Sequence, residues 1–572
     1  MKRALHIVRP ACVALLGALA FANVVPRGDF VFDDHVLIER NVDIRRSDIW
    51  WTAFRRDYYA TSQEMGGSGY YRPIVVLCNA GDLRLWRGRR WGYHVTNLVL
   101  HAGASAALGA ALRALGATGA AAWVAAVLFA VHPVHAESVA FASGRVDVLA
   151  GLGVFLALAA AASRRRFAWL VVGAAALGAF LSKEAAVVLP LLLALVWVAR
   201  ARSERDAGVM GDRAASGWLT KQVAAVAVAC GVALALRRLA LHAWLPATAQ
   251  GAPIGQRALL PFETILFALS SLYAPVRRLA LEPQPVHVGA LRLALGAAAA
   301  LVLWIAAWRA DRPARPLLGR SLWGAGLALL PVLNLFPQET LLSERYLYLA
   351  SAFLLVPVGV LVVAGWRRGG NARPLTAGAC AVAALALLGI SAWRAQAWRN
   401  DETLWRQAVQ EEPDRAAFWD RLGLTLTEKH RFEEAEKALR KAVALDPGLF
   451  NAQLNLGALL QSTRRHGEAI AAYQKALALQ PRHVNAHLNI GVSKLDLGDL
   501  RGAYAEFQTA VAIKPDHFDA ARLAGSLALR LGRLQEARRY LEQARRLYPQ
   551  DERVQSELLM LGRSEQKAAA RP

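Results

Sequence analysis

Cysteine is scarce in this 572-residue sequence, which contains only Cys12, Cys78, Cys230 and Cys380. No two of them form a Cys-x-x-Cys pair, and none has the spacing of a zinc site. Three lie inside apolar runs, where cysteine behaves as a small hydrophobic residue. The sequence therefore predicts neither a disulfide framework nor a cysteine-bound metal. Charged residues are also few, at 19% of the chain.

Hydrophobic residues, by contrast, make up 55% of the chain, and before residue 395 they form runs long enough to cross a bilayer. The net charge of +24 comes mostly from short arginine clusters between these runs, as is typical of cytoplasmic loops near anionic lipid. The C-terminal part is too mixed in charge sign to predict a nucleic-acid partner. We therefore predict an all-α, polytopic membrane protein with a soluble C-terminal domain.

The charge pattern also predicts a topology. Lys2, Arg3 and Arg9 place the N-terminus in the cytoplasm, and we interpret the signal-peptide-like start as a retained first span. The loop over residues 27–91 then lies outside. Residues 262–276 are predicted to be interfacial or re-entrant, because a crossing there would place the basic stretch 309–320 outside. About eleven spans remain, and this odd number also places the C-terminal domain outside. The predicted spans end near residues 25, 112, 131, 164, 181, 198, 236, 307, 336, 364 and 393.

The C-terminal domain is predicted from an internal repeat. Prolines recur every 34 residues, and Leu-Gly, Ile-Gly or Ala-Gly pairs and two sets of alanines keep the same register. This pattern is typical of the tetratricopeptide (TPR) repeat, in which small residues let paired helices approach closely. The recurring prolines are Pro413, Pro447, Pro481, Pro515 and Pro549. We predict a membrane domain at 1–395, a TPR solenoid at 396–563 with a half-repeat, four repeats and a terminal helix, and a disordered tail at 564–572.

Polar clusters interrupt the apolar sequence at predicted outside corners. The first is Phe30-Val31-Phe32-Asp33-Asp34-His35, the second runs from His132 to Glu137, and the third is Ser182-Lys183-Glu184. Charges at a membrane edge are costly unless they pair or bind a ligand, so these corners are candidate functional sites. An ordinary solvated loop is the alternative for the acidic pair.

The order of these motifs resembles the transmembrane and TPR-repeat family of O-mannosyltransferases over almost the whole chain. Residues 239–287 depart from the pattern. The resemblance implies a GT-C membrane fold and a sugar held as a polyprenyl phosphate on the outer face. The motifs that carry it are Phe32-Asp33-Asp34, Asn41-Val42-Asp43, Tyr71-Arg72-Pro73, Tyr93-His94 with Asn97 and His101, His132-Pro133-Val134-His135-Ala136-Glu137, Gly144-Arg145-Val146-Asp147, Lys183-Glu184 and Ser343-Glu344-Arg345-Tyr346-Leu347-Tyr348.

Such a transfer needs a carboxylate as general base and cations around the leaving phosphate. The resemblance places the base in the first loop, and of the two acids we prefer Asp34 to Asp33. Arg345 is the first candidate for the phosphate, because a guanidinium grips phosphate bidentately. The remaining donor-site or substrate-site candidates are Glu344, Tyr346, Glu137, His132, His135, Arg145, Asp147, Lys183, Glu184, Tyr71, Arg72 and His94.

Each candidate also has a purely structural interpretation. Arg345 can pair with Glu344 or another loop acid, and Lys183 with Glu184 can be a plain ion pair. Arg145 and Asp147 are predicted to pair with each other or with the first loop. His132 and His135 with Glu137 lack a firm further ligand set, so a divalent metal is possible there but is not predicted, and no cofactor is predicted.

These observations predict an inverting membrane glycosyltransferase that moves a hexose from a polyprenyl-phosphate donor to a Ser, Thr or glycan hydroxyl. The repeats are expected to recruit the acceptor protein. No nucleotide-binding signature favours a sugar-nucleotide donor. A non-enzymatic TPR scaffold for envelope proteins and a lipid-phosphate transporter remain alternatives. The composition and compact loops predict a bacterial inner membrane, with the repeats in the periplasm.

Overall fold

The structure is a computed structural model that describes residues 2–26, 28–59, 69–163, 165–206, 212–242, 259–275, 290–310, 316–333 and 342–569. Within these ranges the secondary structure is helical and contains no strand. The chain divides into two compact units, Met1–Leu404 and Trp405–Pro572. The division lies a few residues beyond the predicted domain boundary at residue 395.

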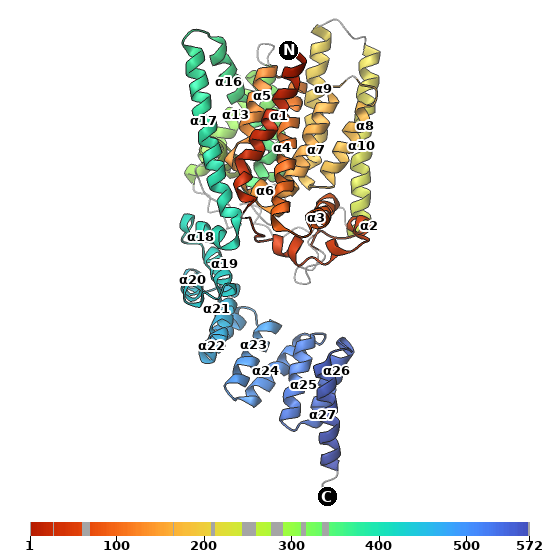
Figure 1. Cartoon of the computed structure of the whole chain (residues 1–572), viewed down its shortest axis with the longest axis vertical. Coiled ribbons are helices and arrows are strands. Elements are labelled where there is room, and N and C mark those ends of the chain that lie inside the picture. Colours follow the sequence, from red (N-terminus) through yellow and green to blue (C-terminus); the bar gives the residue numbers. More distant parts are fainter. Residues whose placement is uncertain are drawn as a thin grey trace. The chain divides into compact units, whose positions relative to one another are not determined.

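The N-terminal unit is a bundle of long apolar helices with short helices at its ends (Figure 1). Helices suit such sequences because every backbone hydrogen bond is satisfied within the segment. The α-helices are α1 (Lys2–Phe21), α2 (Ile49–Thr52), α3 (Pro73–Leu85), α4 (Arg90–Ala114), α5 (Gly119–Ala130), α6 (Ala136–Ala140), α7 (Arg145–Ala161), α8 (Ala168–Phe180), α9 (Leu189–Asp206), α10 (Asp212–Leu241), α12 (Leu260–Tyr273), α13 (Ala290–Ala310), α14 (Pro316–Leu329), α15 (Tyr348–Leu354), α16 (Val356–Arg367) and α17 (Ala372–Ala395).

Seven described helical segments are long and apolar enough to cross a membrane, and an eighth span is formed if a bent pair is counted as one. That pair, Gly119–Ala130 with Pro133–Ala140, bends by 50°. Three further predicted spans fall on shorter apolar helices, at 10–24, 168–180 and 317–332. The segment predicted not to cross, at 262–276, coincides largely with α12, which is also a short apolar helix. The unit is thus a multi-span membrane domain.

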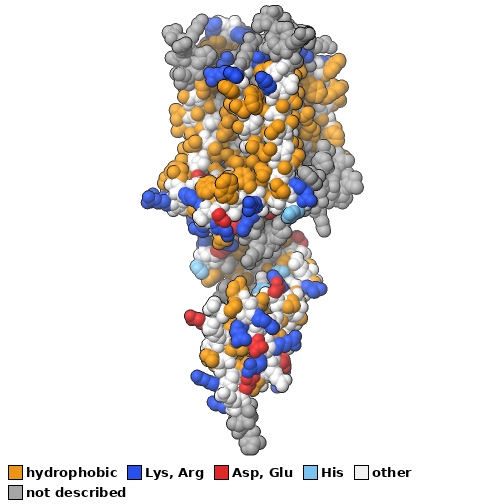
Figure 2. All heavy atoms as spheres, turned by 90° about the vertical axis from the view of Figure 1, so that its right-hand side faces the viewer, with side chains coloured by type: hydrophobic (Ala, Val, Ile, Leu, Met, Phe, Trp, Pro, Cys, Tyr) orange, Lys and Arg blue, Asp and Glu red, His pale blue; other side chains and the backbone are white. Residues whose placement is uncertain are grey.

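The outer surface of this unit is apolar, and its interior is packed through small residues. Figure 2 shows hydrophobic side chains covering the bundle on the face in view. Leu361 and Leu385 are each about 70% exposed, as expected for side chains that face lipid. Inside, a Cβ on Gly153 would lie 2.8 Å from a carbonyl of α8, and one on Gly359 would lie 2.8 Å from a carbonyl of α5. Glycine at these positions therefore permits close helix contact.

The segment between α1 and α4 folds at one end of the bundle, the end at which α2, α3 and α6 are seen in Figure 1. It has its own hydrophobic core, in which Phe30, Ile38, Ile44 and Val75 pack with Tyr93 of α4. The acidic pair Asp33-Asp34 is therefore flanked by residues that are packed in this core.

The C-terminal unit consists of helix pairs followed by one longer helix. α18 (Asp401–Glu411) leads into it, as predicted for the half-repeat. The repeats that follow are α19 (Ala416–Glu428) with α20 (Phe432–Leu445), α21 (Phe450–Ser462) with α22 (His466–Leu479), α23 (Val484–Asp496) with α24 (Leu500–Ile513), and α25 (Phe518–Arg530) with α26 (Leu534–Leu547), before α27 (Glu552–Ala569).

The repeat register explains this packing. The glycine of each first helix faces a bulky side chain of the second: a Cβ on Gly457 would lie 2.6 Å from the Tyr473 ring, and one on Gly491 would lie 2.4 Å from Phe507. Each recurring proline lies two residues beyond the end of a helix, where it blocks continuation. The prediction of a disordered tail from residue 564 was wrong for most of its length, because α27 continues to Ala569.

Candidate functional site

The acidic pair lies on a tight turn that follows α1. Phe32 has a positive φ of 50°, a conformation that L-residues rarely adopt. Val31 before it is fully buried, and the backbone N–H of Asp34 donates to the Val31 carbonyl. The turn gives the two adjacent carboxylates different environments.

Asp34 points into the protein. Its side chain is fully buried and accepts hydrogen bonds from the Val31 N–H at 3.1 Å, the Ser143 N–H at 2.7 Å and the Ser143 hydroxyl at 2.5 Å. Burial raises the pKa of Asp34 to about 7, and the donated hydrogen bonds oppose that rise. With both oxygens engaged, Asp34 fixes the turn against the start of α7.

Asp33, by contrast, is only partly buried. The Tyr59 hydroxyl donates to its carboxylate at 3.2 Å. Burial, with Asp33 as the next contribution, raises the pKa of Tyr59 well above its ordinary value, so this phenol remains a donor. Asp33 is also within electrostatic range of Arg345. Of the two acids, Asp33 is therefore the more exposed.

Three cations come from three different helix ends. Arg72 precedes Pro73, the first residue of α3; Lys183 lies between α8 and η7 (Glu184–Val188); and Arg345 lies in η9 (Glu344–Leu347). Lys183 interacts electrostatically with both arginines. Positive charges near one another repel, so each of them needs a counter-charge.

Each cation has a carboxylate partner. Arg72 pairs with Glu184 at 3.0 Å and lies over the Tyr70 ring at 4.4 Å. Lys183 pairs with Asp147 at the start of α7. The alternative of an ion pair between Lys183 and Glu184 is not what the structure shows, because Lys183 pairs with Asp147 and Glu184 pairs with Arg72.

Arg345 pairs with Glu137 of α6 at 3.6 Å, which matches the structural alternative of a loop acid as its partner. Glu137 is held in place by the Ser343 hydroxyl, at 2.8 Å from both carboxylate oxygens, and by the Arg345 N–H at 3.2 Å. The Arg345 side chain is 26% exposed, and its guanidinium lies 5.6 Å from the Tyr346 ring centre. Tyr346 also lies beneath Lys183, at 4.8 Å. The structure thus brings Glu137, Arg345, Tyr346, Lys183 and Asp147 together.

Other predicted site residues are structural. Arg145 is fully buried and binds Asp82 of α3 at 2.6 Å and the Tyr93 carbonyl at 3.1 Å. This confirms the predicted pairing of Arg145 with the first loop, while Asp147 pairs elsewhere. Glu344 forms a buried ion pair with Arg394 of α17. The Tyr71 hydroxyl donates to the Phe54 carbonyl at 3.0 Å.

The histidines lie within the bundle. His94 is buried against Gly28, where a Cβ would lie 2.5 Å from the ring. His132 contacts the Leu272 carbonyl at 3.0 Å, and His135 packs among His101, Phe129 and Tyr348. In the described ranges, no group of three His, Cys, Asp or Glu residues is placed to hold a metal ion.

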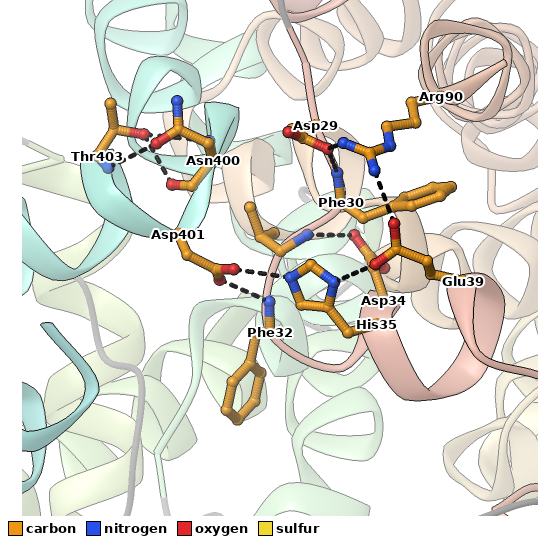
Figure 3. A network of polar contacts seen from close by, with 11 residues as sticks. Asp29, Phe30, Phe32, Asp34, His35, Glu39, Arg90, Asn400, Asp401 and Thr403 are labelled. Atoms are coloured by element: carbon orange, nitrogen blue, oxygen red, sulfur yellow. Dashed lines mark hydrogen bonds and ion pairs between the residues drawn. The ribbon is translucent and has the colours of Figure 1, made fainter. Parts of the chain in front are cut away.

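Several residues of the site were not among the sequence predictions. For Ser143 there was a usable signal, because it adjoins the Gly144-Arg145 motif. Asp82 lies on α3 three turns after Arg72, and Tyr59 lies in an aromatic pair without a recognisable motif. Asp401 follows the last span and contacts the acidic turn (Figure 3). Sequence separations of up to 369 residues hide such contacts.

Comparisons with known proteins agree with this division of the chain. Three tetratricopeptide-repeat models match residues 416–449, 454–513 and 494–558. The protein O-mannosyl-transferase Tmtc2 of Drosophila melanogaster is 32% identical over 200 residues, which is 33% of this chain and 21% of that protein. The human protein O-mannosyl-transferase TMTC2 is 32% identical over 144 residues, which is 25% of this chain and 17% of that protein.

The matched regions thus span about a fifth of these relatives' own length. Among solved structures, the crystal structure of MamA is 24% identical, covers 25% of this chain and 84% of its own, and has a TM-score of 0.24. The chain is accordingly a multi-span membrane protein that carries tetratricopeptide repeats and is similar in sequence to the TMTC protein O-mannosyl-transferases.

Proposed function

We propose that the chain is a glycosyltransferase that moves a hexose, mannose in the first instance, from a polyprenyl-phosphate donor to a hydroxyl of a protein acceptor. One observation carries this proposal: Lys183 and Arg345 meet at one aromatic ring, that of Tyr346, at 4.8 Å and 5.6 Å, and the partly buried Asp33 attracts the same arginine. A base beside an anion site is what transfer from a lipid phosphate requires. The similarity to named O-mannosyl-transferases supports the same reaction.

In this proposal Asp33 is the general base, which revises the preference for Asp34. Asp33 accepts the proton of the acceptor hydroxyl as the oxygen attacks the anomeric carbon. The bond from that carbon to the phosphate oxygen breaks, and the lipid phosphate leaves with the electron pair. Arg345, Arg72 and Lys183 neutralise the charge that develops on the phosphate. Tyr59 holds Asp33 in position through its hydroxyl.

The proposed orientation places the site outside the cytoplasm. α4 and α7 both begin at the site and end near Arg113 and Arg165, so short basic loops lie at the other end of the bundle. A Gln566→Cys variant, with the four native cysteines replaced by serine, tests where the repeats lie. Reaction with an impermeant thiol reagent in intact cells supports the orientation. Reaction only after lysis overturns it.

The central experiment measures sugar transfer by the full chain in lipid discs, with labelled polyprenyl-phosphate mannose and an envelope-protein extract. We expect Asp33→Asn to lower the rate by about 10²–10⁴-fold, the usual range for loss of general-base catalysis. Asp34→Asn is expected to reduce the yield of folded protein and to leave measurable transfer in the folded fraction. If wild type fails with mannose, glucose and arabinose donors, the proposal is overturned and the TPR scaffold becomes the better interpretation.

A further inference from the structure

The N-terminus of α18 makes an unusual use of its first acidic residue. An aspartate in the first helical turn ordinarily favours the helix dipole and needs no specific partner. Here the cap is already complete without it, because the Thr403 N–H donates to the Asn400 side chain at 2.9 Å and the Asn400 N–H donates to the Thr403 hydroxyl at 3.1 Å. The carboxylate of Asp401 instead reaches the acidic turn (Figure 3).

Asp401 holds the turn on both sides of Asp33. One oxygen accepts the Phe32 N–H at 2.9 Å, and the other lies 2.7 Å from His35 Nε2. Phe32 is the residue with positive φ, a conformation that costs a non-glycine residue about 1–3 kcal/mol and persists only where the surroundings enforce it. The Asp29 N–H adds a third link by donating to the Arg399 carbonyl at 2.8 Å.

A second group of charges closes the network from the opposite side. His35 Nδ1 lies 2.6 Å from Glu39, Glu39 pairs with Arg90 of α4 at 2.7 Å, and Arg90 also pairs with Asp29. The hydrogen bond to Asp401 raises the pKa of His35 to about 9, with a smaller contribution from Glu39. The imidazolium therefore donates from both nitrogens at neutral pH.

We infer that Asp401 is a positioning residue for Asp33, so that the geometry of the base depends on the first turn of the helix that leads into the repeats. This inference rests on the proposed function where it is tested by sugar transfer. Where it is tested by hydrogen exchange of the acidic turn, it does not. All of the contacts lie within the N-terminal unit, Met1–Leu404. Stabilising the N-terminus of α18 does not require the contacts that Asp401 makes with Phe32 and His35.

The test compares Asp401→Asn with Glu402→Gln, which removes the same charge from the same helical turn. Small misplacements of a catalytic group cost up to about 100-fold in rate. We expect Asp401→Asn to lower kcat by about 10–100-fold and to change the KM for the donor by less than about threefold. We also expect the alkaline limb of the pH–rate profile to move to lower pH, because His35 loses its main acid partner. An unchanged kcat and pH profile for Asp401→Asn overturns the inference.

A structural measurement separates failure of this inference from failure of the proposed function. Hydrogen exchange of residues 28–38, measured on the full chain in lipid discs, is expected to accelerate about tenfold or more in Asp401→Asn and to stay unchanged in Glu402→Gln. His35→Gln should accelerate the same residues, and the double variant should add little, because both changes break one contact. Unchanged exchange in Asp401→Asn overturns the inference, even if wild type transfers no sugar.

Discussion

The two units of the chain differ in how deeply their most buried ion pairs lie. In the N-terminal unit some pairs are fully buried and join distant segments: the side chains of Arg145 and Asp82 are 0% and 5% exposed. In the repeat unit many pairs are more exposed and join one turn to the next or one helix to the next, as with Arg440, which is 51% exposed and pairs with Glu436 and Glu468. A buried pair carries a large desolvation cost, whereas an exposed pair contributes little. Loss of one partner is therefore expected to cost far more stability at a buried pair than at an exposed one.

The strongest test of this contrast breaks a buried pair. Arg145→Met removes the guanidinium and leaves Asp82 uncompensated inside the bundle, which we expect to destabilise the membrane unit by about 3–5 kcal/mol. The measurement is the fraction of folded, monodisperse protein after heating in detergent. Arg368→Met, at an exposed helix end, is the matched control and should behave as wild type. Equal thermal stability of the two variants would contradict the contrast.

The sequence predicted the repeat unit in detail but only part of the site. A 34-residue register determines which alanines, glycines and prolines meet, because each repeat contacts its neighbours alone. The ion pairs of the membrane unit depend on distant segments. Lys183 is extended, with φ of −158° and ψ of 140°, so its side chain and that of Glu184 diverge to different partners. Ser343 is extended in the same way, and the two residues after it also have different partners: Glu344 pairs with Arg394, and Arg345 pairs with Glu137.

The two acids of the first loop show the same limit. Asp33 and Asp34 are adjacent and chemically identical, so no local pattern distinguishes them. Ser143, 109 residues away, determines which carboxylate is buried. The choice of base therefore required the fold.

The second prediction tests the packing of the repeat unit. Gly457→Ala would place a methyl group 2.6 Å from the Tyr473 ring, and overpacking of this kind costs about 1–3 kcal/mol. Gly467→Ala is the control, since no atom lies within 4 Å of its Cβ and alanine favours the helix by up to about 1 kcal/mol. Thermal unfolding followed by circular dichroism should show opposite shifts in Tm. A lowered Tm for Gly467→Ala would contradict the conclusion that this position is open and Gly457 is crowded.

The third prediction concerns pH and the contact between His35 and Asp401. The pKa of His35 is raised to about 9 in the folded protein, chiefly by the hydrogen bond to Asp401. A raised pKa of a basic group means that its stabilising contribution is complete below about pH 6.5 and is lost as the pH rises through about 9. We expect the exchange protection of residues 28–38, corrected for intrinsic rates, to fall between pH 8 and 10. In His35→Gln this pH dependence should be absent.

The smallest effect is expected where an exposed pair is removed. Arg440 bonds Glu436 at 2.8 Å and Glu468 at 3.3 Å, yet its side chain is half exposed, so solvent competes for each contact. Arg440→Ala should destabilise the repeat unit by less than about 1 kcal/mol, and raising the salt concentration should reduce even this difference. Chemical denaturation of the full chain, followed by the helical signal of the repeats, measures it. A loss as large as that of Arg145→Met would show that burial does not separate the two kinds of ion pair.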